Sequence, residues 1–232
     1  MFVAAVVAAL TVGYLVAGYT VPGRDSTSGN PLFDFGGRIE DVLPPDSSDA
    51  TNRTIPGDVA AIAAKVTPSV VNITTTLGYQ TGTAAGTGIV ISSSGEVLTN
   101  YHVIDGATKI TVDIGGSGSV HTATVLGRAR AEDVALLQIQ GVSGLKAAQV
   151  GDASKVSVGD EVVAIGNALG RGGVPEVTSG TVTALDQEAT AHDPSSGTSE
   201  TLEGLIETNV PLQPGDSGGP LIDSSARVVG MN

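Results

Sequence analysis

The chain contains no cysteine and no tryptophan, and it is poor in aromatic and charged residues. Without cysteine, a disulfide framework, a zinc-thiolate site and a thiol nucleophile are all excluded. Charged residues make up 15% of the sequence, against about 25% in an average protein. Lysine and arginine number 11 against 24 aspartates and glutamates, which gives a net charge of −13. Because nucleic-acid phosphates require a basic face, this balance argues against nucleic acid as a partner.

Charge is missing altogether from Met1 to Val21. A helix of about 20 apolar residues spans a hydrocarbon core of about 30 Å. The alternatives are a buried core helix and a cleaved signal peptide, but the run is long and no clear small-residue cleavage site follows it. We therefore expect residues 1–21 to form a transmembrane helix. Residues 22–57 are rich in Pro, Ser, Gly and Asp, so we expect a disordered linker there.

The rest of the chain has the composition of a β protein. Glycine is abundant, at 32 of 232 residues, and short runs of Val, Ile and Thr alternate with turn residues. A short amphipathic helix is predicted between Asp58 and Pro68. Strands are predicted at Ser69–Thr76, Gly86–Ser92, Glu96–Thr99, Thr108–Ile114, Val120–Leu126 and Val134–Gln140, and then at Glu161–Gly166, Val177–Leu185, Leu202–Thr208, Gly219–Ile222 and Arg227–Met231. We expect an all-β fold of two antiparallel barrels, residues 58–150 and 151–232, side by side.

A glycine-rich stretch near the end of the chain surrounds Ser217, with Gly215 and Asp216 before it and Gly218 and Gly219 after it. Glycines permit positive φ angles, so consecutive N–H groups can point into one small space. A serine held there can attack a carbonyl, while the N–H groups of Gly215, Asp216 and Ser217 receive the developing oxyanion. The alternative is an ordinary turn between two strands.

Ser217 needs a base and an orienting acid. His121 lies in a strand of Thr, Ala and Val and is interpreted as a surface or edge residue, and His192 lies in a polar loop. His102, in contrast, follows a strand and has small and apolar neighbours. Asp133 is the last charge before a nearly apolar strand, where it can fix the tautomer of an imidazole. The Gly-x-Ser-x-Gly spacing also fits the nucleophile elbow of α/β-hydrolases, but that fold needs a histidine after the serine and none follows. His102, Asp133 and Ser217 stand in the chymotrypsin order, which agrees with the all-β pattern.

Three short segments resemble the active-site motifs of chymotrypsin-fold serine peptidases and, more narrowly, the HtrA (DegP-type) family. They are Thr99–Val103, Asp133–Leu137 and Gly215–Pro220, supported by Pro68–Ile73, Gly86–Ile91 and Ala164–Asn167. The anchored layout is most similar to actinobacterial, PepA-like members. The resemblance implies a serine endopeptidase acting on unfolded proteins outside the cytoplasm, held in the cell membrane by one span, with no cofactor and no metal. Family members are often trimers, so a homotrimer is an allowed assembly.

The sequence also departs from the family pattern. Tyr101 and Asp216 stand where members often have Asn, and members usually continue beyond the position of Asn232 with more of the second barrel and a PDZ domain. We therefore expect an incomplete second barrel, which puts the activity of this chain by itself in question. Pro211 and Leu212 occupy the expected substrate pocket without a buried acid, which favours small or medium aliphatic residues at P1. A non-catalytic peptide-binding module and an esterase remain the alternative functions.

Overall fold

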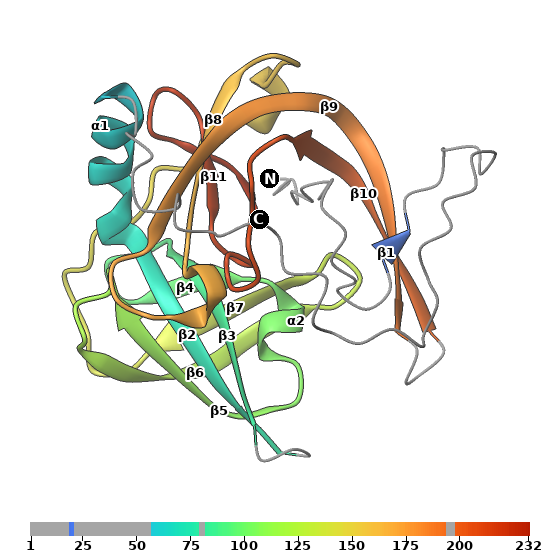
Figure 1. The fold of residues 1–232 in the computed structure, drawn as a ribbon. Coiled ribbons are helices and arrows are strands. Elements are labelled where there is room, and N and C mark those ends of the chain that lie inside the picture. The colour runs from blue at the N-terminus through green and yellow to red at the C-terminus, as the bar shows by residue number, and fades with distance from the viewer. Residues whose placement is uncertain (1–18, 21–56, 79–81, 194–197) are drawn as a thin grey trace, which may run out of the picture.

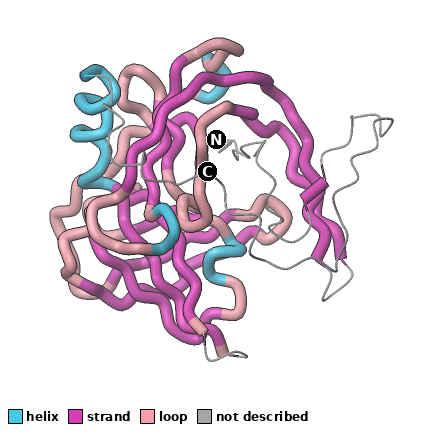
Figure 2. The backbone as a smooth tube through the Cα atoms, viewed as in Figure 1, coloured by secondary structure: helices cyan, strands magenta, loops and turns pink. Residues whose placement is uncertain are grey.

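The computed structural model describes residues 19–20, 57–78, 82–193 and 198–232 (Figure 1). Strands dominate these residues and helices are short (Figure 2). Every strand predicted in either group is present. The largest difference in length is at β9 (Glu176–Asp193), which continues well past the predicted end at Leu185.

The first group of strands closes into a six-stranded antiparallel barrel, in the order β2-β3-β4-β7-β6-β5. The strands are β2 (Val70–Leu77), β3 (Thr83–Val90), β4 (Glu96–Thr99), β5 (Ala107–Ile114), β6 (Val120–Ala129) and β7 (Val134–Ile139). Burial alternates along β7, where Ala135, Leu137 and Ile139 face the core. Closure leaves no strand of this barrel with a free edge, so its interior is packed from all sides.

The second group forms a half-barrel, as an incomplete second barrel predicts. Its sheet has the order β1-β9-β8-β11-β12, with β10 also paired to β9. The strands after β7 are β8 (Glu161–Gly166), β9, β10 (Thr198–Thr208), β11 (Pro220–Ile222) and β12 (Val228–Met231). β9 and β10 make a long hairpin that arches away from β8 (Figure 1). A second apolar core lies under this sheet, around Val162, Ile206 and Leu221.

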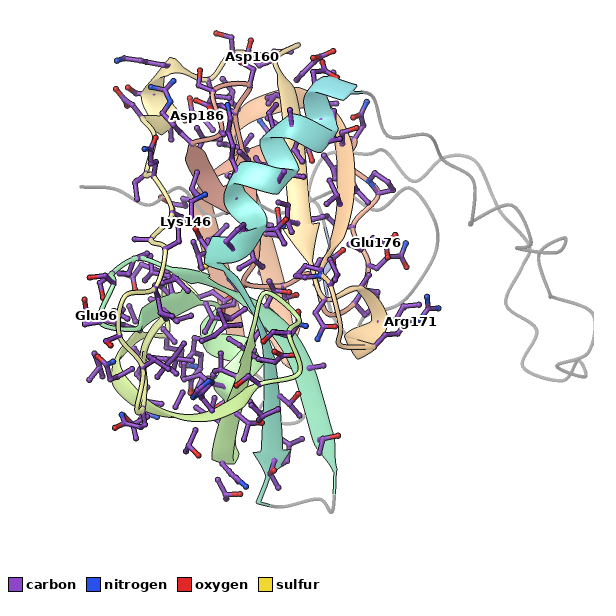
Figure 3. The ribbon with its side chains drawn as sticks, turned by 90° about the vertical axis from the view of Figure 1, so that its left-hand side faces the viewer. Glu96, Lys146, Asp160, Arg171, Glu176 and Asp186 are labelled. Carbon is purple, nitrogen blue, oxygen red and sulfur yellow. The ribbon has the colours of Figure 1, made fainter. Side chains whose placement is uncertain are left out.

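The helix at the start of the folded region links the two groups. α1 (Gly57–Val66) is followed by a 3-10 turn, η3 (Thr67–Ser69), that contains Pro68. Its predicted apolar face is buried, and Val59 and Ala63 pack with Ile165 of the half-barrel. α1 therefore covers the half-barrel, although the chain continues from it directly into the closed barrel. In Figure 3, Lys146 of the connecting segment lies between the two regions, and its Nζ donates to Lys65 C=O at 2.6 Å.

The predicted membrane anchor lies outside the described residues except at its end. Tyr19–Thr20 form the short strand β1, paired with Thr190 and Ala191 of β9, so these two residues are extended rather than helical. Of the helices that the structure describes, none is long and apolar enough to cross a membrane. The predicted linker also lies outside the described residues, apart from Gly57 at the start of α1.

Candidate active site

The pairing of β4 with β7 brings the predicted base and acid together. Their antiparallel register sets Thr99, the last residue of β4, opposite Ala135 near the start of β7. A short helix, α2 (Tyr101–Ile104), begins just after β4, and Asp133 lies just before β7. His102 and Asp133 are 31 residues apart in sequence, yet both lie at the same end of the barrel.

Asp133 holds His102 through both carboxylate oxygens. Oδ1 accepts the backbone N–H of His102 at 2.9 Å, and Oδ2 lies 2.8 Å from Nδ1 of its ring. The side chain of Asp133 is 14% exposed and that of His102 is 50% exposed. With the Nδ1 proton directed at the carboxylate, Nε2 is the basic nitrogen, on the accessible side chain. This is the arrangement expected of a general base and its orienting acid.

The backbone of Asp133 is held as firmly as its side chain. Its φ of 49° lies in the left-handed region, which aspartate tolerates better than most residues. In a turn, Asp133 N–H donates to Arg130 C=O at 3.0 Å. Asp133 C=O accepts hydrogen bonds from Tyr101 N–H and Asn100 Nδ2, each at 3.1 Å. Since Asn100 and Tyr101 directly precede His102, these bonds hold the acid and the base together as one unit.

The segment around Ser217 makes two successive tight turns before β11. Asp216 N–H donates to Gln213 C=O at 3.0 Å, and Gly219 N–H donates to Asp216 C=O at 2.9 Å. Gly215 and Gly218 have φ of 101° and 85°. A Cβ on Gly218 would lie 2.1 Å from Thr87 C=O, so this position accepts only glycine. The predicted glycine requirement is therefore a matter of close backbone approach as well as of positive φ.

Two backbone donors remain free beside Ser217. Among the described residues, neither Gly215 N–H nor Ser217 N–H has a hydrogen-bond partner. The carbonyls of the same two peptides are occupied, because Pro214 C=O accepts Leu169 N–H at 2.6 Å and Asp216 C=O accepts Gly219 N–H. In a trans peptide the N–H points opposite to the C=O, so both donors point away from these partners. The third predicted donor, Asp216 N–H, is not available, because the turn uses it for Gln213 C=O.

The two regions are tied together close to the site. Thr87 N–H of β3 donates to Ser217 C=O at 2.8 Å, and Thr99 Oγ1 donates to Thr87 C=O at 2.7 Å. These contacts join the Ser217 segment of the half-barrel to the strand that leads into His102. Within the described part of the chain no hydrogen bond joins Ser217 Oγ to His102 Nε2. Such bonds are often long in unliganded enzymes and shorten when substrate binds.

Comparison with known proteins agrees with this geometry. Residues 86–231 match the family described as the trypsin-like peptidase domain. The chain is 38% identical over 186 residues to the serine protease PepD of Mycobacterium tuberculosis, an alignment covering 76% of this chain and 39% of PepD. It is 37% identical over 150 residues to the periplasmic serine endoprotease DegP of Escherichia coli, covering 64% and 30%. The chain belongs to the HtrA type of the trypsin-like peptidases.

A solved structure supports the same assignment. The HtrA-type protease AlgW with a tripeptide superimposes with a TM-score of 0.64 and 31% identity, covering 75% of this chain and 53% of that chain. The chain therefore spans about half of AlgW and 39% or less of PepD and DegP. In this HtrA-type chain, the closed barrel contributes His102 and Asp133 to the candidate active site, and the half-barrel contributes Ser217.

Asp216, which takes part in both turns around Ser217, is buried. Its Oδ2 accepts Gln213 N–H at 2.8 Å, and its Oδ1 has no hydrogen-bond partner within the described residues. Burial raises the pKa of Asp216 to about 6, and the nearby carboxylate of Glu176 acts in the same direction. The Asp216 carboxyl is therefore costly to ionise in the folded state.

The residues of the predicted substrate pocket are less well defined. Leu212 is half-buried and packs against the core of the half-barrel, whereas Pro211 is exposed. The pocket formed by these two residues stays a prediction. His121, interpreted as a surface or edge residue, is half-buried on β6 with Nε2 3.3 Å from Ser119 Oγ. His192 lies on β9 rather than in the predicted loop.

Sequence reasoning missed one residue at this site, Thr87. It contacts the Ser217 segment, the segment before His102 and the loop after β8, all from a buried position on β3. A threonine within a strand is ordinary, since β-branched residues favour strands, so nothing in the residue type distinguished it.

Proposed function

We propose that this chain is a serine endopeptidase that hydrolyses peptide bonds through a triad of His102, Asp133 and Ser217. The observation that carries the proposal is the double contact of the Asp133 carboxylate with the backbone N–H and Nδ1 of His102. This contact leaves Nε2 as the base, on a side chain that is 50% exposed. The free N–H groups of Gly215 and Ser217 support it independently, because acyl transfer needs donors for the oxyanion.

In the proposed reaction, Nε2 of His102 takes the proton of Ser217 Oγ as the oxygen attacks the peptide carbonyl. Gly215 N–H and Ser217 N–H receive the negative charge of the tetrahedral intermediate, and Asp133 stabilises the imidazolium. The imidazolium then gives its proton to the leaving amine, which departs and leaves an ester on Ser217. Water, activated by His102, hydrolyses that ester and restores the free hydroxyl.

We further propose that the substrates are unfolded or misfolded proteins outside the cytoplasm. DegP, a similar protein, is named as a periplasmic endoprotease, and the uncharged run at residues 1–21 supports a membrane anchor in this chain. The absence of an acid at Pro211 and the apolar Leu212 support cleavage after Val, Ala or Leu rather than after Lys or Arg. Cleavage of a peptide library mainly after Arg would contradict this specificity.

Covalent labelling tests the proposed chemistry. A fluorophosphonate probe phosphonylates only a serine activated by a neighbouring base, so the full chain should gain one adduct, located on Ser217 by peptide mass mapping. Ser217→Ala should abolish labelling. Ser225→Ala, which removes an exposed hydroxyl in the turn after β11, should leave labelling unchanged.

A non-catalytic peptide-binding module is the second candidate function. The observation that favours it is the lack of a hydrogen bond between Ser217 Oγ and His102 Nε2 in the described structure. A chain that binds an extended peptide but gains no adduct from the probe would establish this function in place of the first. Hydrolysis of small esters without hydrolysis of proteins would instead identify an esterase.

A further inference from the structure

Thr87 is completely buried, and each of its polar groups has a partner. Its backbone N–H binds Ser217 C=O and its C=O accepts the hydroxyl of Thr99. Its own hydroxyl connects two further segments: Oγ1 accepts Asn167 N–H at 2.8 Å and donates to Gly215 C=O at 2.7 Å. A hydroxyl has one proton, so the donor role toward Gly215 and the acceptor role toward Asn167 are both required and mutually consistent.

The two partners of the Thr87 hydroxyl both bear on Gly215 N–H, one of the two free oxyanion donors. Gly215 C=O belongs to the same residue, and Asn167 belongs to the loop that binds the preceding carbonyl. Asn167 begins the loop that contains η5 (Ala168–Gly170), and Leu169 N–H of that loop holds Pro214 C=O. Gly215 has its N–H directed by the Pro214 contact and its C=O held by Thr87. The backbones approach closely here, since a Cβ on Gly215 would lie 2.3 Å from Asn167 C=O. The orientation of Gly215 N–H therefore depends on both anchors.

Gly215 needs such anchors because glycine restricts its own backbone least. With a φ of 101° and no side chain, either peptide beside it can rotate at low cost unless its groups are bound. Rotation of the Pro214–Gly215 peptide would remove Gly215 N–H from the position where an oxyanion forms. The Thr87 hydroxyl opposes this rotation twice, at Gly215 C=O directly and at the η5 loop through Asn167.

We propose that Thr87 is a positioning residue for the oxyanion hole, acting on Gly215 N–H from the closed barrel. The inference rests on the proposed peptidase function and adds to it a residue that contacts no substrate. Because the oxyanion develops in the transition state and the tetrahedral intermediate and is absent from the bound substrate, loss of the Thr87 hydroxyl should lower kcat and leave KM nearly unchanged. Loss of one oxyanion donor costs about 10²–10³-fold in kcat, which sets the upper limit of the effect.

The test compares Thr87→Val, Thr87→Ser and Thr75→Val with the unchanged full chain. Valine has the shape of threonine without the hydroxyl, and serine keeps the hydroxyl without the methyl. Thr75 is the matched control: it is also completely buried in the closed barrel, with a hydroxyl bonded to Ala84 C=O at 3.4 Å. We expect Thr87→Val to lower kcat and the rate of fluorophosphonate labelling at least tenfold at unchanged KM, with recovery in Thr87→Ser and no such change in Thr75→Val.

Each outcome distinguishes this inference from the proposed function. If the unchanged chain neither cleaves peptides nor reacts with the probe, the peptidase proposal fails and this inference fails with it. If the unchanged chain is active and Thr87→Val keeps its kcat, or loses activity through KM alone, only the role of Thr87 is overturned. If circular dichroism shows that Thr87→Val does not fold, Thr87→Ala replaces it, and equal kcat for the alanine and serine variants overturns the proposal.

Discussion

The closed barrel and the half-barrel contribute to the site in different ways. In the closed barrel, His102 lies just after β4 and Asp133 just before β7, and the pairing of these two strands brings them to the same end of the barrel. In the half-barrel, Ser217 lies on turns between β10 and β11, where no sheet pairing places it. Its position comes instead from contacts with Thr87 of the other region and with the η5 loop. The base is thus positioned by strand pairing, and the nucleophile by loop contacts, both with the closed barrel and within the half-barrel.

This difference explains why glycine and tight turns are concentrated around Ser217 and not around His102. Next to a paired strand, hydrogen bonds of the sheet already fix most of the backbone, and of His102 and Asp133 only Asp133, in the turn before β7, has a positive φ. A turn that must approach a neighbouring strand and leave two N–H groups free needs positive φ angles and the absence of Cβ atoms. Changes that separate the two regions should therefore affect the nucleophile and the oxyanion donors before the base.

The largest expected effect tests whether the two regions act as one catalytic unit. Ser217→Ala in the half-barrel should lower kcat by about 10⁶, and the double variant with His102→Ala should be hardly worse than Ser217→Ala alone. Residues that act in one proton transfer are not additive, because either loss already abolishes it. Steady-state kinetics on an unfolded protein substrate, with each variant checked for folding, would measure this. If the fold-loss of kcat in the double variant equalled the product of the two single-variant losses, the two regions would act separately.

Core packing should also distinguish the regions. Leu137 of β7 and Leu221 of β11 are both completely buried, one inside the closed barrel and one in the half-barrel. Leucine-to-alanine changes in a core cost about 2–5 kcal/mol, and the cost depends on how far the surroundings can collapse. We expect Leu137→Ala near the upper end and Leu221→Ala nearer the lower end, since an open sheet relaxes more easily.

Urea unfolding of both variants beside the unchanged chain would measure the two differences in the free energy of unfolding. A larger loss for Leu221→Ala would contradict the view that closure makes the first region the less adaptable one. Hydrogen exchange of β7 and β11 amides in the unchanged chain provides the matching control, because it reports local opening without a substitution.

Much of this architecture could be predicted from the sequence, because the relevant signals are local. Alternating apolar residues between Gly, Ser and Asp define the strands, and chain order selects His102, Asp133 and Ser217. The outer half of β9 was missed because Asp186, Gln187 and Glu188 interrupt the apolar pattern. That segment is a strand because β10 pairs with it, a partnership that no local pattern records.

The details of the oxyanion donors could not be predicted for a similar reason. Three consecutive N–H groups around Ser217 look equivalent in sequence, and only the turn to Gln213 removes that of Asp216. The two bonds of the Thr87 hydroxyl join residues 80 and 128 positions away in the chain. Such contacts depend on how the two regions pack, which no residue type encodes by itself.

A buried carboxyl in the half-barrel predicts a pH effect of intermediate size. Burial raises the pKa of Asp216 to about 6 from an ordinary value of 3.8. The folded state then binds the proton more tightly than the unfolded state, so this group's contribution to stability is fully present below about pH 4. It is lost as pH rises through about 6, by up to about 3 kcal/mol in all.

Asp216→Asn removes this ionisation and isolates its effect. The variant should be more stable than the unchanged chain at pH 8, and the difference should vanish near pH 4. Thermal or urea unfolding at several pH values measures it, with Asp152→Asn as the control, since Asp152 is exposed and hydrogen bonds lower the pKa of its carboxyl. A difference between the Asp216 variant and the unchanged chain that does not change with pH would rule out this account of the buried carboxyl.

The smallest expected effect concerns a single contact between the regions. Asn72 of β2 is buried, and its Nδ2 donates to Gly173 C=O at 2.7 Å, so that it joins the closed barrel to the loop after η5. Asn72→Ala should cost about 1 kcal/mol of unfolding free energy. It should also raise hydrogen exchange at Gly170 and Gly172, whose N–H groups bind Asn167.

Thr111→Val removes a comparable bond within the closed barrel, from Thr111 Oγ1 to Thr74 C=O at 3.1 Å, and should leave this exchange unchanged. Equal exchange in the two variants would mean that the loop is held by the half-barrel alone.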